Sequence, residues 1–132
     1  MKGYNGEIEK ITLDNNKFRQ VLYTGKNSQL VVMSLKPGQD IGSEVHVDHD
    51  QFFRFESGVG KVVIDGTETE VKDGSASIVP AGAEHNVINT SETEDLKLYT
   101  IYSPPEHRFD VVHNTKEIAL SDDEHFDGTT TE

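Results

Sequence analysis

The stretch from Gly38 to Asn89 contains two alternating segments joined by a compact hairpin. Between residues 51 and 56, Gln51, Phe53 and Phe55 occupy one set of alternate positions, and polar or aromatic residues occupy the other. Asp65-Gly66 separates two short runs and is a strong signal for a two-residue hairpin turn. A two-residue period is typical of strands rather than helices. This stretch therefore predicts short β-strands connected by tight turns.

The whole chain shows the same pattern: its 11 glycines and clusters of Asn, Asp and Ser separate short apolar runs. Strands are expected at residues 19–23, 30–35, 42–46, 51–56, 61–64, 68–71, 75–79, 85–89 and 96–102. No helical period precedes the C-terminal end, where a short helix is expected over residues 114–120, capped by Asn114 or Thr115. The spacing predicts an all-β barrel or sandwich, as one domain over residues 1–132 with a loose acidic tail from about residue 121.

Four side chains with metal-binding atoms lie at positions that such strands can bring together. Glu44 and His46 are two residues apart and point to one face of a strand. Gln51 opens the returning strand, and His85 begins a later strand after a Pro-Ala-Gly turn. Two imidazoles, one carboxylate and one carboxamide oxygen suit a divalent ion such as Fe, Mn, Ni, Zn or Co. His49, in the turn after His46, is a rival ligand that strand geometry alone does not aim inward.

The two segments resemble the paired signature of the cupin superfamily of small β-barrels. The second segment has that pattern's residues at Gly74, Pro80, Gly82, His85 and Asn89, and the first agrees at Gly38, His46 and Gly58. The first departs where the family usually has His and this chain has Glu44, and where it usually has Glu and this chain has Gln51. The resemblance implies a double-stranded β-helix, or jelly roll, and a metal held by Glu44, His46, Gln51 and His85.

The two departures leave the formal charge of the ligand set at minus one. A divalent ion would therefore retain net positive charge, which favours an anionic substrate or a deprotonated water. A carboxamide oxygen is a weaker donor than imidazole, so we expect weaker metal binding than in a site with three histidines. The segment from residue 103 to 120 resembles the closing segment of a subgroup of small bacterial cupins that are similar to mannose-6-phosphate isomerase.

Some polar residues have simpler interpretations. His107 and His113 follow the last strand and are expected in a surface loop, and Asn89 is expected to hold a loop through its amide. The strand at residues 19–23 is expected at an edge, where it could pair with a second copy in a homodimer.

Composition narrows the partners and the location. Twenty-four acidic and 12 basic residues give a net charge of −12, which disfavours nucleic acid as a partner. The absence of cysteine excludes disulfides and thiolate chemistry. No stretch has the apolar length of a membrane span and the N-terminus lacks a secretory core, so a cytoplasmic protein is expected.

Three classes of function agree with these features: a metal-dependent enzyme acting on a small molecule, with isomerase or dioxygenase chemistry; a small-molecule binding or sensing barrel; and a subunit with a vestigial site. The chain offers no clear general base outside the proposed ligands, because Glu84 is expected to alternate to the outside.

Overall fold

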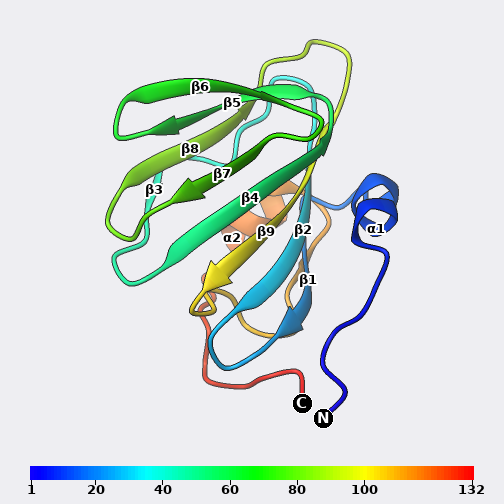
Figure 1. Ribbon diagram of the computed structural model, residues 1–132, viewed down its shortest axis with the longest axis vertical. Coiled ribbons are helices and arrows are strands. Elements are labelled where there is room, and N and C mark those ends of the chain that lie inside the picture. The colour runs from blue at the N-terminus through cyan, green and yellow to red at the C-terminus, as the bar shows by residue number, and fades with distance from the viewer.

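The computed structural model describes residues 1–132 as two antiparallel sheets packed face to face (Figure 1). The six-stranded sheet has the order β10-β1-β2-β9-β4-β7, and the four-stranded sheet has the order β3-β8-β5-β6. The strands are β1 (Arg19–Thr24), β2 (Gln29–Leu35), β3 (Glu44–Val45), β4 (Asp50–Ser57), β5 (Val59–Ile64), β6 (Thr67–Lys72), β7 (Ala76–Val79), β8 (Glu84–Asn89), β9 (Leu96–Ser103) and β10 (Val112–His113). The predicted all-β class and jelly-roll arrangement are confirmed.

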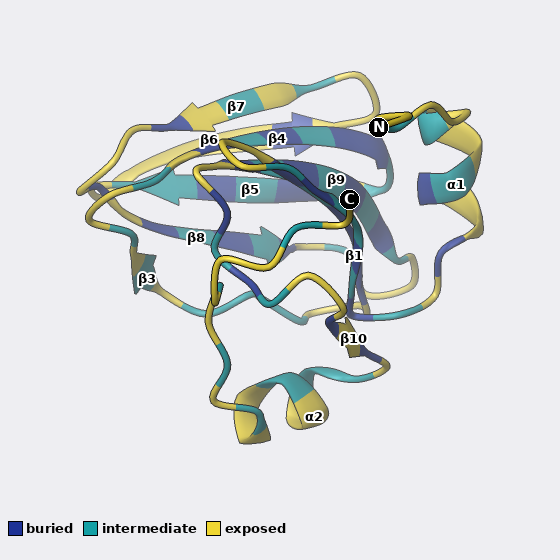
Figure 2. Cartoon of the chain, turned by 90° about the horizontal axis from the view of Figure 1, so that it is seen from below, coloured by how far each residue is buried: buried dark blue, intermediate teal, exposed yellow.

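Alternation along the strands creates the core between the sheets. Phe53 and Phe55 of β4 and Leu96 and Leu98 of β9 are fully buried. The intervening residues face outward, as expected for strands whose successive side chains point to opposite sides. Buried residues gather on the strands, whereas the surface helix α2 (Lys116–Ser121) has none (Figure 2).

Two local predictions are confirmed by backbone geometry and hydrogen bonding. Asp65 and Gly66 both have positive φ, 46° and 82°, as the predicted two-residue hairpin turn requires. The Asn89 amide donates to the carbonyl oxygens of Leu35 and Glu94, at 3.0 and 2.8 Å, and so ties down the loop after β8.

The helices differ partly from expectation. The C-terminal helix α2 is confirmed, and the Thr115 side chain accepts a hydrogen bond from the amide of Ile118 at its N-terminus. The expectation of no earlier helix is wrong, because α1 (Ile8–Asp14) packs against the six-stranded sheet. It has no side-chain N-cap, and packing that buries Thr12 completely stabilises it instead. Neither helix combines the length and apolarity that crossing a membrane requires.

The C-terminal tail is packed against the barrel, contrary to the prediction that it is loose from residue 121. The Glu124 side chain is only 3% exposed and accepts hydrogen bonds from His107 and from the amide of Arg108. The Phe126 amide donates to the carbonyl oxygen of Glu106 at 2.9 Å. At the end of the chain, the Glu132 carboxylate accepts from the amides of Lys2 and Gly3, so the two termini lie side by side (Figure 1).

Three further expectations about the surface are corrected. His107 and His113 are buried, because their ring nitrogens contact carboxylates of the tail that packs over them. The strand β1 is not a free edge along its whole length, since Arg19 and Gln20 pair with β10. The strand β3 spans two residues rather than the expected 42–46, so His46 lies in the connection that follows it.

Candidate metal centre

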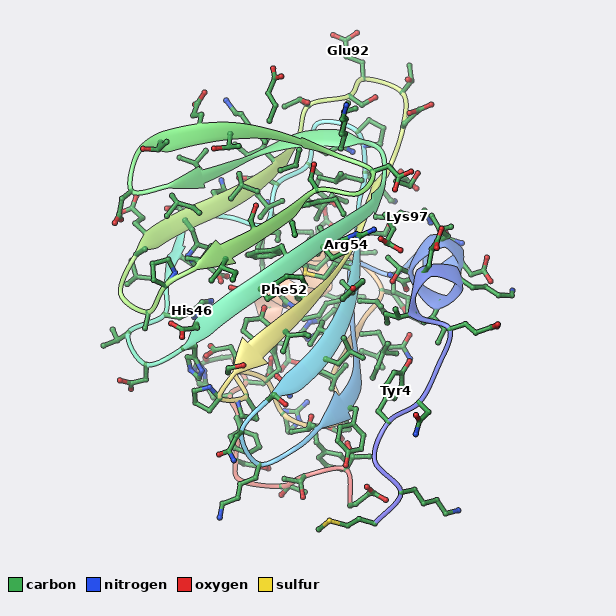
Figure 3. All side chains as sticks on the ribbon, in the orientation of Figure 1. Tyr4, His46, Phe52, Arg54, Glu92 and Lys97 are labelled. Carbon is green, nitrogen blue, oxygen red and sulfur yellow. The ribbon has the colours of Figure 1, made fainter.

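Donor side chains from both sheets meet at one end of the barrel. Glu44 of β3 lies directly opposite His85 of β8 in the four-stranded sheet. Gln51 of β4 belongs to the other sheet, where it pairs with Val79 and Tyr102. His46 is supplied by the connection between β3 and β4 (Figure 3). Closure of the two sheets therefore brings together residues that are far apart in the sequence.

Three of the four expected donors form a compact group. Glu44, His46 and His85 each present one ligand atom, and these atoms all lie within 4.8 Å of one another. Glu44 Oε2 is 3.0 Å from His46 Nε2, and the rings of His46 and His85 have centroids 5.2 Å apart. These separations are compatible with a single cation between the ligand atoms.

Gln51 is the fourth member and turns its carbonyl oxygen toward the group. The residue is buried, its Nε2 donates to Thr100 Oγ1 at 3.0 Å, and its Oε1 lies 3.1 Å from His85 Nε2. The hydrogen bond to Thr100 occupies the amide nitrogen, so the oxygen is the atom available to a metal. An oxygen is also the atom that a carboxamide uses as a metal ligand.

The outer nitrogens of both histidines face acceptors elsewhere in the protein. His85 Nδ1 is 3.2 Å from the carbonyl oxygen of Ala83, and His46 Nδ1 is 3.7 Å from Glu106 Oε2. A hydrogen bond such as that of His85 holds a metal-binding imidazole with its second nitrogen free for the ion, whereas the separation at His46 is an ion-pair contact longer than a hydrogen bond. His46 Nε2 is buried and has no hydrogen-bond partner, because Glu44 Oε2 is close but not aligned for a hydrogen bond. An orphaned nitrogen beside a carboxylate fits a cation site.

The electrostatics of the group favour the metal-binding forms of Glu44 and His85, whereas the raised pKa of His46 favours its protonated form. Burial opposes ionisation of Glu44, but contact with His46 and the nearby positive charges lower its pKa overall. Burial is the main cause of the lowered pKa of His85, and the charge of His46 adds to it. Burial also acts to lower the pKa of His46, yet contact with Glu44 and the charge of Glu106 raise it. Glu44 is thus held as a carboxylate and His85 as a neutral ring, the ligand forms of both side chains.

His49, the rival ligand, lies next to the group but is engaged elsewhere. Its ring centroid is 5.7 Å from that of His46. Its Nδ1 lies 2.7 Å from the carbonyl oxygen of Pro104, and its Nε2 lies 2.8 Å from Glu106 Oε2. Both ring nitrogens therefore face acceptors, and Glu44 rather than His49 joins the two histidines in the compact group.

Several neighbours of this group had no signal in the sequence. Glu106 follows a Pro-Pro pair and contacts His46 and His49. The ring of Tyr102 is 5.8 Å from that of His46, and its hydroxyl is 3.2 Å from His107 Nε2. The second nitrogen of His107 meets Glu124. Tyr102 lies on the predicted strand β9. Spacing cannot identify Glu106, His107 and Glu124, because the segment after β9 and the tail reach the barrel through long-range packing.

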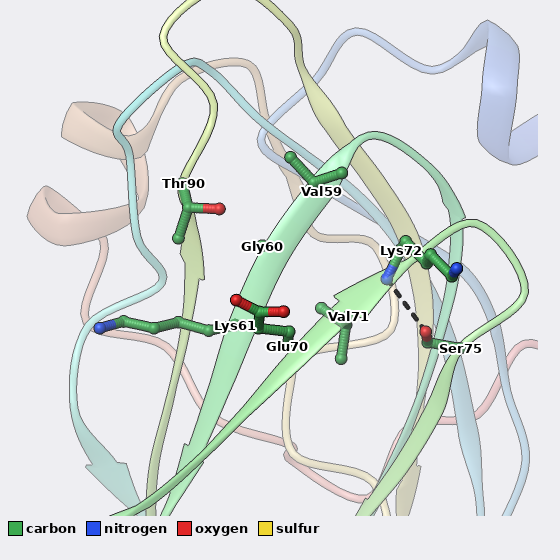
Figure 4. Close-up of a pocket in the computed structure, with 8 residues that line it drawn as sticks. All are labelled: Val59, Gly60, Lys61, Glu70, Val71, Lys72, Ser75 and Thr90. Atoms are coloured by element: carbon green, nitrogen blue, oxygen red, sulfur yellow. Dashed lines mark hydrogen bonds between the residues drawn. The ribbon is translucent and has the colours of Figure 1, made fainter.

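One surface cavity lies next to the metal centre, and another lies away from it. A cavity of about 390 Å³ is lined by Asp48, His49, Pro104, Pro105, Glu106, His125 and Phe126, and its residues His49 and Glu106 contact or adjoin His46. A cavity of about 460 Å³ lies between β5, β6 and the ends of neighbouring strands (Figure 4). Neither cavity is lined by any of the four expected metal donors, but the first lies next to the metal centre because Glu106 and His49 adjoin His46.

Comparison with known proteins finds a matching domain model and similar relatives. Residues 31–102 match the model of the cupin domain. The uncharacterized protein YrkC of Bacillus subtilis (strain 168) is 48% identical over 120 residues, which cover 86% of this chain but 64% of that protein. The chain therefore spans just under two thirds of the length of this relative.

Solved structures agree with this result. The crystal structure of BH2720 from Bacillus halodurans is similar with a TM-score of 0.88 and 42% identity, covering 90% of this chain and 94% of that one. An uncharacterized conserved protein with a double-stranded β-helix domain from Klebsiella pneumoniae has a TM-score of 0.62 and 26% identity, covering 69% and 79%. The match to the cupin domain and these structural likenesses confirm the resemblance expected from the paired motifs.

Proposed function

The chain belongs to the cupin family, and on this premise we propose that it binds one divalent metal ion through Glu44, His46 and His85, with Gln51 as a fourth donor. The observation that carries the proposal is the convergence of two Nε2 atoms on Glu44 and Gln51 while both Nδ1 atoms face other acceptors. Hydrogen bonding alone leaves His46 Nε2 unsatisfied, and a cation would satisfy it.

The donor set narrows the metal to the borderline divalent ions. Two nitrogens, one carboxylate and one neutral oxygen suit Fe, Mn, Ni, Zn or Co better than Ca or Mg, which prefer oxygen alone. With one anionic ligand, the occupied site would carry net positive charge and would attract an anionic small molecule. The bound ion would supply Lewis-acid or redox chemistry.

We propose that the protein is an enzyme acting on a small molecule, with isomerase or dioxygenase chemistry as the classes to test. Its own residues would bind and orient the substrate at the mouth, where Glu106 and His49 stand beside His46. The alternative is a binding or sensing barrel without turnover. That alternative is favoured by the pairing of His49 with Glu106, since neither side chain is free to act as a base while they are paired.

The proposed partners follow from charge and cavity size. A net charge of −12 disfavours nucleic acid, and a cavity of about 390 Å³ suits a small-molecule ligand. A homodimer and a cytoplasmic location are also part of the proposal. Sedimentation analysis of the purified protein tests the dimer, and an observed monomer would remove that part.

Metal analysis tests the centre directly. Protein purified without chelator is expected to contain close to one equivalent of metal, and His46→Ala and His85→Ala are each expected to lose it. His125→Ala is the matched control, because the side chain of His125 is 75% exposed and lies outside the donor group. Metal retained at full occupancy in His85→Ala would contradict the proposed ligands. Turnover of a sugar phosphate, keto acid or phenol that both substitutions abolish would separate an enzyme from a binder.

A further inference from the structure

Three imidazoles face the carboxylate of Glu106 beside the metal centre. One of them, His46, belongs to the donor group already described, and its Nδ1 is 3.7 Å from Glu106 Oε2. The other two lie outside that group: His49 Nε2 is 2.8 Å from Glu106 Oε2, and His125 Nδ1 is 3.9 Å from Glu106 Oε1. His49, Glu106 and His125 also line the cavity of about 390 Å³. They form a second group of metal-binding atoms, which opens to a cavity.

The contact between His49 and Glu106 requires a proton or a metal ion between its two atoms. His49 Nδ1 lies 2.7 Å from the carbonyl oxygen of Pro104, to which a neutral ring donates its hydrogen. The other nitrogen, Nε2, is then an acceptor that faces a carboxylate oxygen at 2.8 Å. A metal ion would bind both atoms. A backbone carbonyl at the opposite ring nitrogen is a common arrangement of metal-binding imidazoles.

His125 presents a similar arrangement from the tail, residues 121–132. Its Nδ1 faces Glu106, and its Nε2 lies 3.5 Å from Asp123 Oδ1. One ring nitrogen is thus directed to the shared carboxylate and the other to an oxygen atom, as in His49. The side chain is 75% exposed, so its ring can turn toward an ion without displacing core residues.

Hydrogen bonds fix the backbone of Glu106 on both sides. Its amide donates to Oε1 of the buried Gln29 at 3.2 Å. Its carbonyl oxygen accepts from the amide of Phe126 at 2.9 Å, which holds the neighbouring His125 beside it. The three donors come from the turn before β4, from the segment after β9 and from the tail. An ion bound to all three would therefore fasten the tail to the barrel.

The separations suit one tetrahedral ion. Metal–ligand distances of about 2.0–2.2 Å place neighbouring ligand atoms of a tetrahedral zinc site about 3.4 Å apart. The two observed separations, 2.8 and 3.9 Å, lie on either side of that value. Two imidazoles and one carboxylate are also a known ligand set for zinc that leaves a fourth position for water. Asp48 lines the same cavity and adds negative charge.

We propose that His49, Glu106 and His125 bind a second divalent cation, Zn²⁺ or a similar borderline ion, which clasps the tail to the barrel. The site uses none of the four donors of the first centre, so the proposal does not rest on the proposed function. Exposure of His125 makes it the weaker of the two sites, and purification is expected to remove its ion. His125→Ala therefore remains a valid control for the first centre.

Zinc titration, measured by calorimetry, tests the proposal in His85→Ala, which disables the first centre. We expect one equivalent of Zn²⁺ to bind with a Kd below about 100 µM. Adding His49→Ala, Glu106→Gln or His125→Ala should weaken this binding by at least about tenfold. The matched control is Asp127→Asn, which removes the same charge as Glu106→Gln from the tail and should leave the affinity within about twofold.

Hydrogen exchange measures the clasp separately. The Phe126 amide is bonded to Glu106 and exchanges when the tail opens. Zn²⁺ at about ten times its Kd should slow this exchange about tenfold in His85→Ala, because binding favours the closed state by the factor 1 + [L]/Kd. The same addition should leave the exchange unchanged when His125→Ala is also present.

Three results would overturn the assignment. They are no zinc binding by His85→Ala at about 1 mM, unchanged affinity when either His49 or His125 is replaced, and unchanged exchange of the Phe126 amide. If His85→Ala fails to fold, titration of purified wild-type protein gives the same comparison as binding beyond the ion already held. Failure of the first centre is distinguishable, because it appears as absent metal in purified wild-type protein or as full occupancy in His85→Ala.

Discussion

Removing the carboxylate of Glu124 should destabilise the protein far more than its position near the chain end suggests. The side chain is 3% exposed and accepts two hydrogen bonds, from His107 Nδ1 and from the amide of Arg108 at 2.7 Å. In Glu124→Ala both donors lose their partner in a mostly buried setting. Hydrogen bonds to charged groups contribute about 1.5–3 kcal/mol each, so the expected loss of unfolding free energy is about 3 kcal/mol or more.

For a chain of this length, that loss corresponds to a fall in melting temperature of about 10 °C. Thermal and urea unfolding, followed by circular dichroism, measure it. The matched control is Asp123→Ala, the preceding acidic residue, whose side chain is fully exposed. If Glu124→Ala melts within about 2 °C of Asp123→Ala, the tail does not contribute to the folded barrel and the reasoning is refuted.

Three further predictions concern the donor group and pH. Glu44→Gln should weaken metal binding by at least about 100-fold, as measured by competition with a chelator, because it removes the only anionic donor. Gln51→Glu should tighten binding by adding charge; unchanged affinity here, together with weaker binding in His49→Ala, would instead favour His49 as a ligand. Burial acts to raise the folded-state pKa of Glu124, but the hydrogen bond from His107 lowers this pKa overall. Its stabilising contribution is therefore complete above the unfolded-state pKa and disappears as the pH falls through the folded-state pKa. The wild-type protein should lose more stability than Glu124→Gln over that acidic window, and equal losses in the two unfolding series would contradict this.

Local signals explain why most strands could be predicted. Alternation in β4 and β9 depends on a period of two residues that any half-buried strand must show. The Asp65-Gly66 turn needs residues that tolerate positive φ, and Asn89 carries an amide suited to holding a loop. Each of these features is encoded within a few neighbouring residues.

The missed elements depend on distant partners. The helix α1 is seven residues long and lacks a side-chain N-cap, so packing on the sheet stabilises it and its own sequence gives little indication. His107 and His113 look like loop residues until Glu124 and Asp122 of the tail pack against them. The tail itself is acidic and polar, and only its specific contacts distinguish it from a disordered end.

From the sequence by itself came the strand pattern, the hairpin and the types of donor atom at Glu44, His46, Gln51 and His85. Tertiary structure decided which donors converge and that Glu106 lies beside His46. The reason is physical: periodicity reports which side of a strand a residue faces, whereas proximity across the barrel is created when the two sheets close. The charges and hydrogen bonds of a site are properties of that closure, and no short segment contains them.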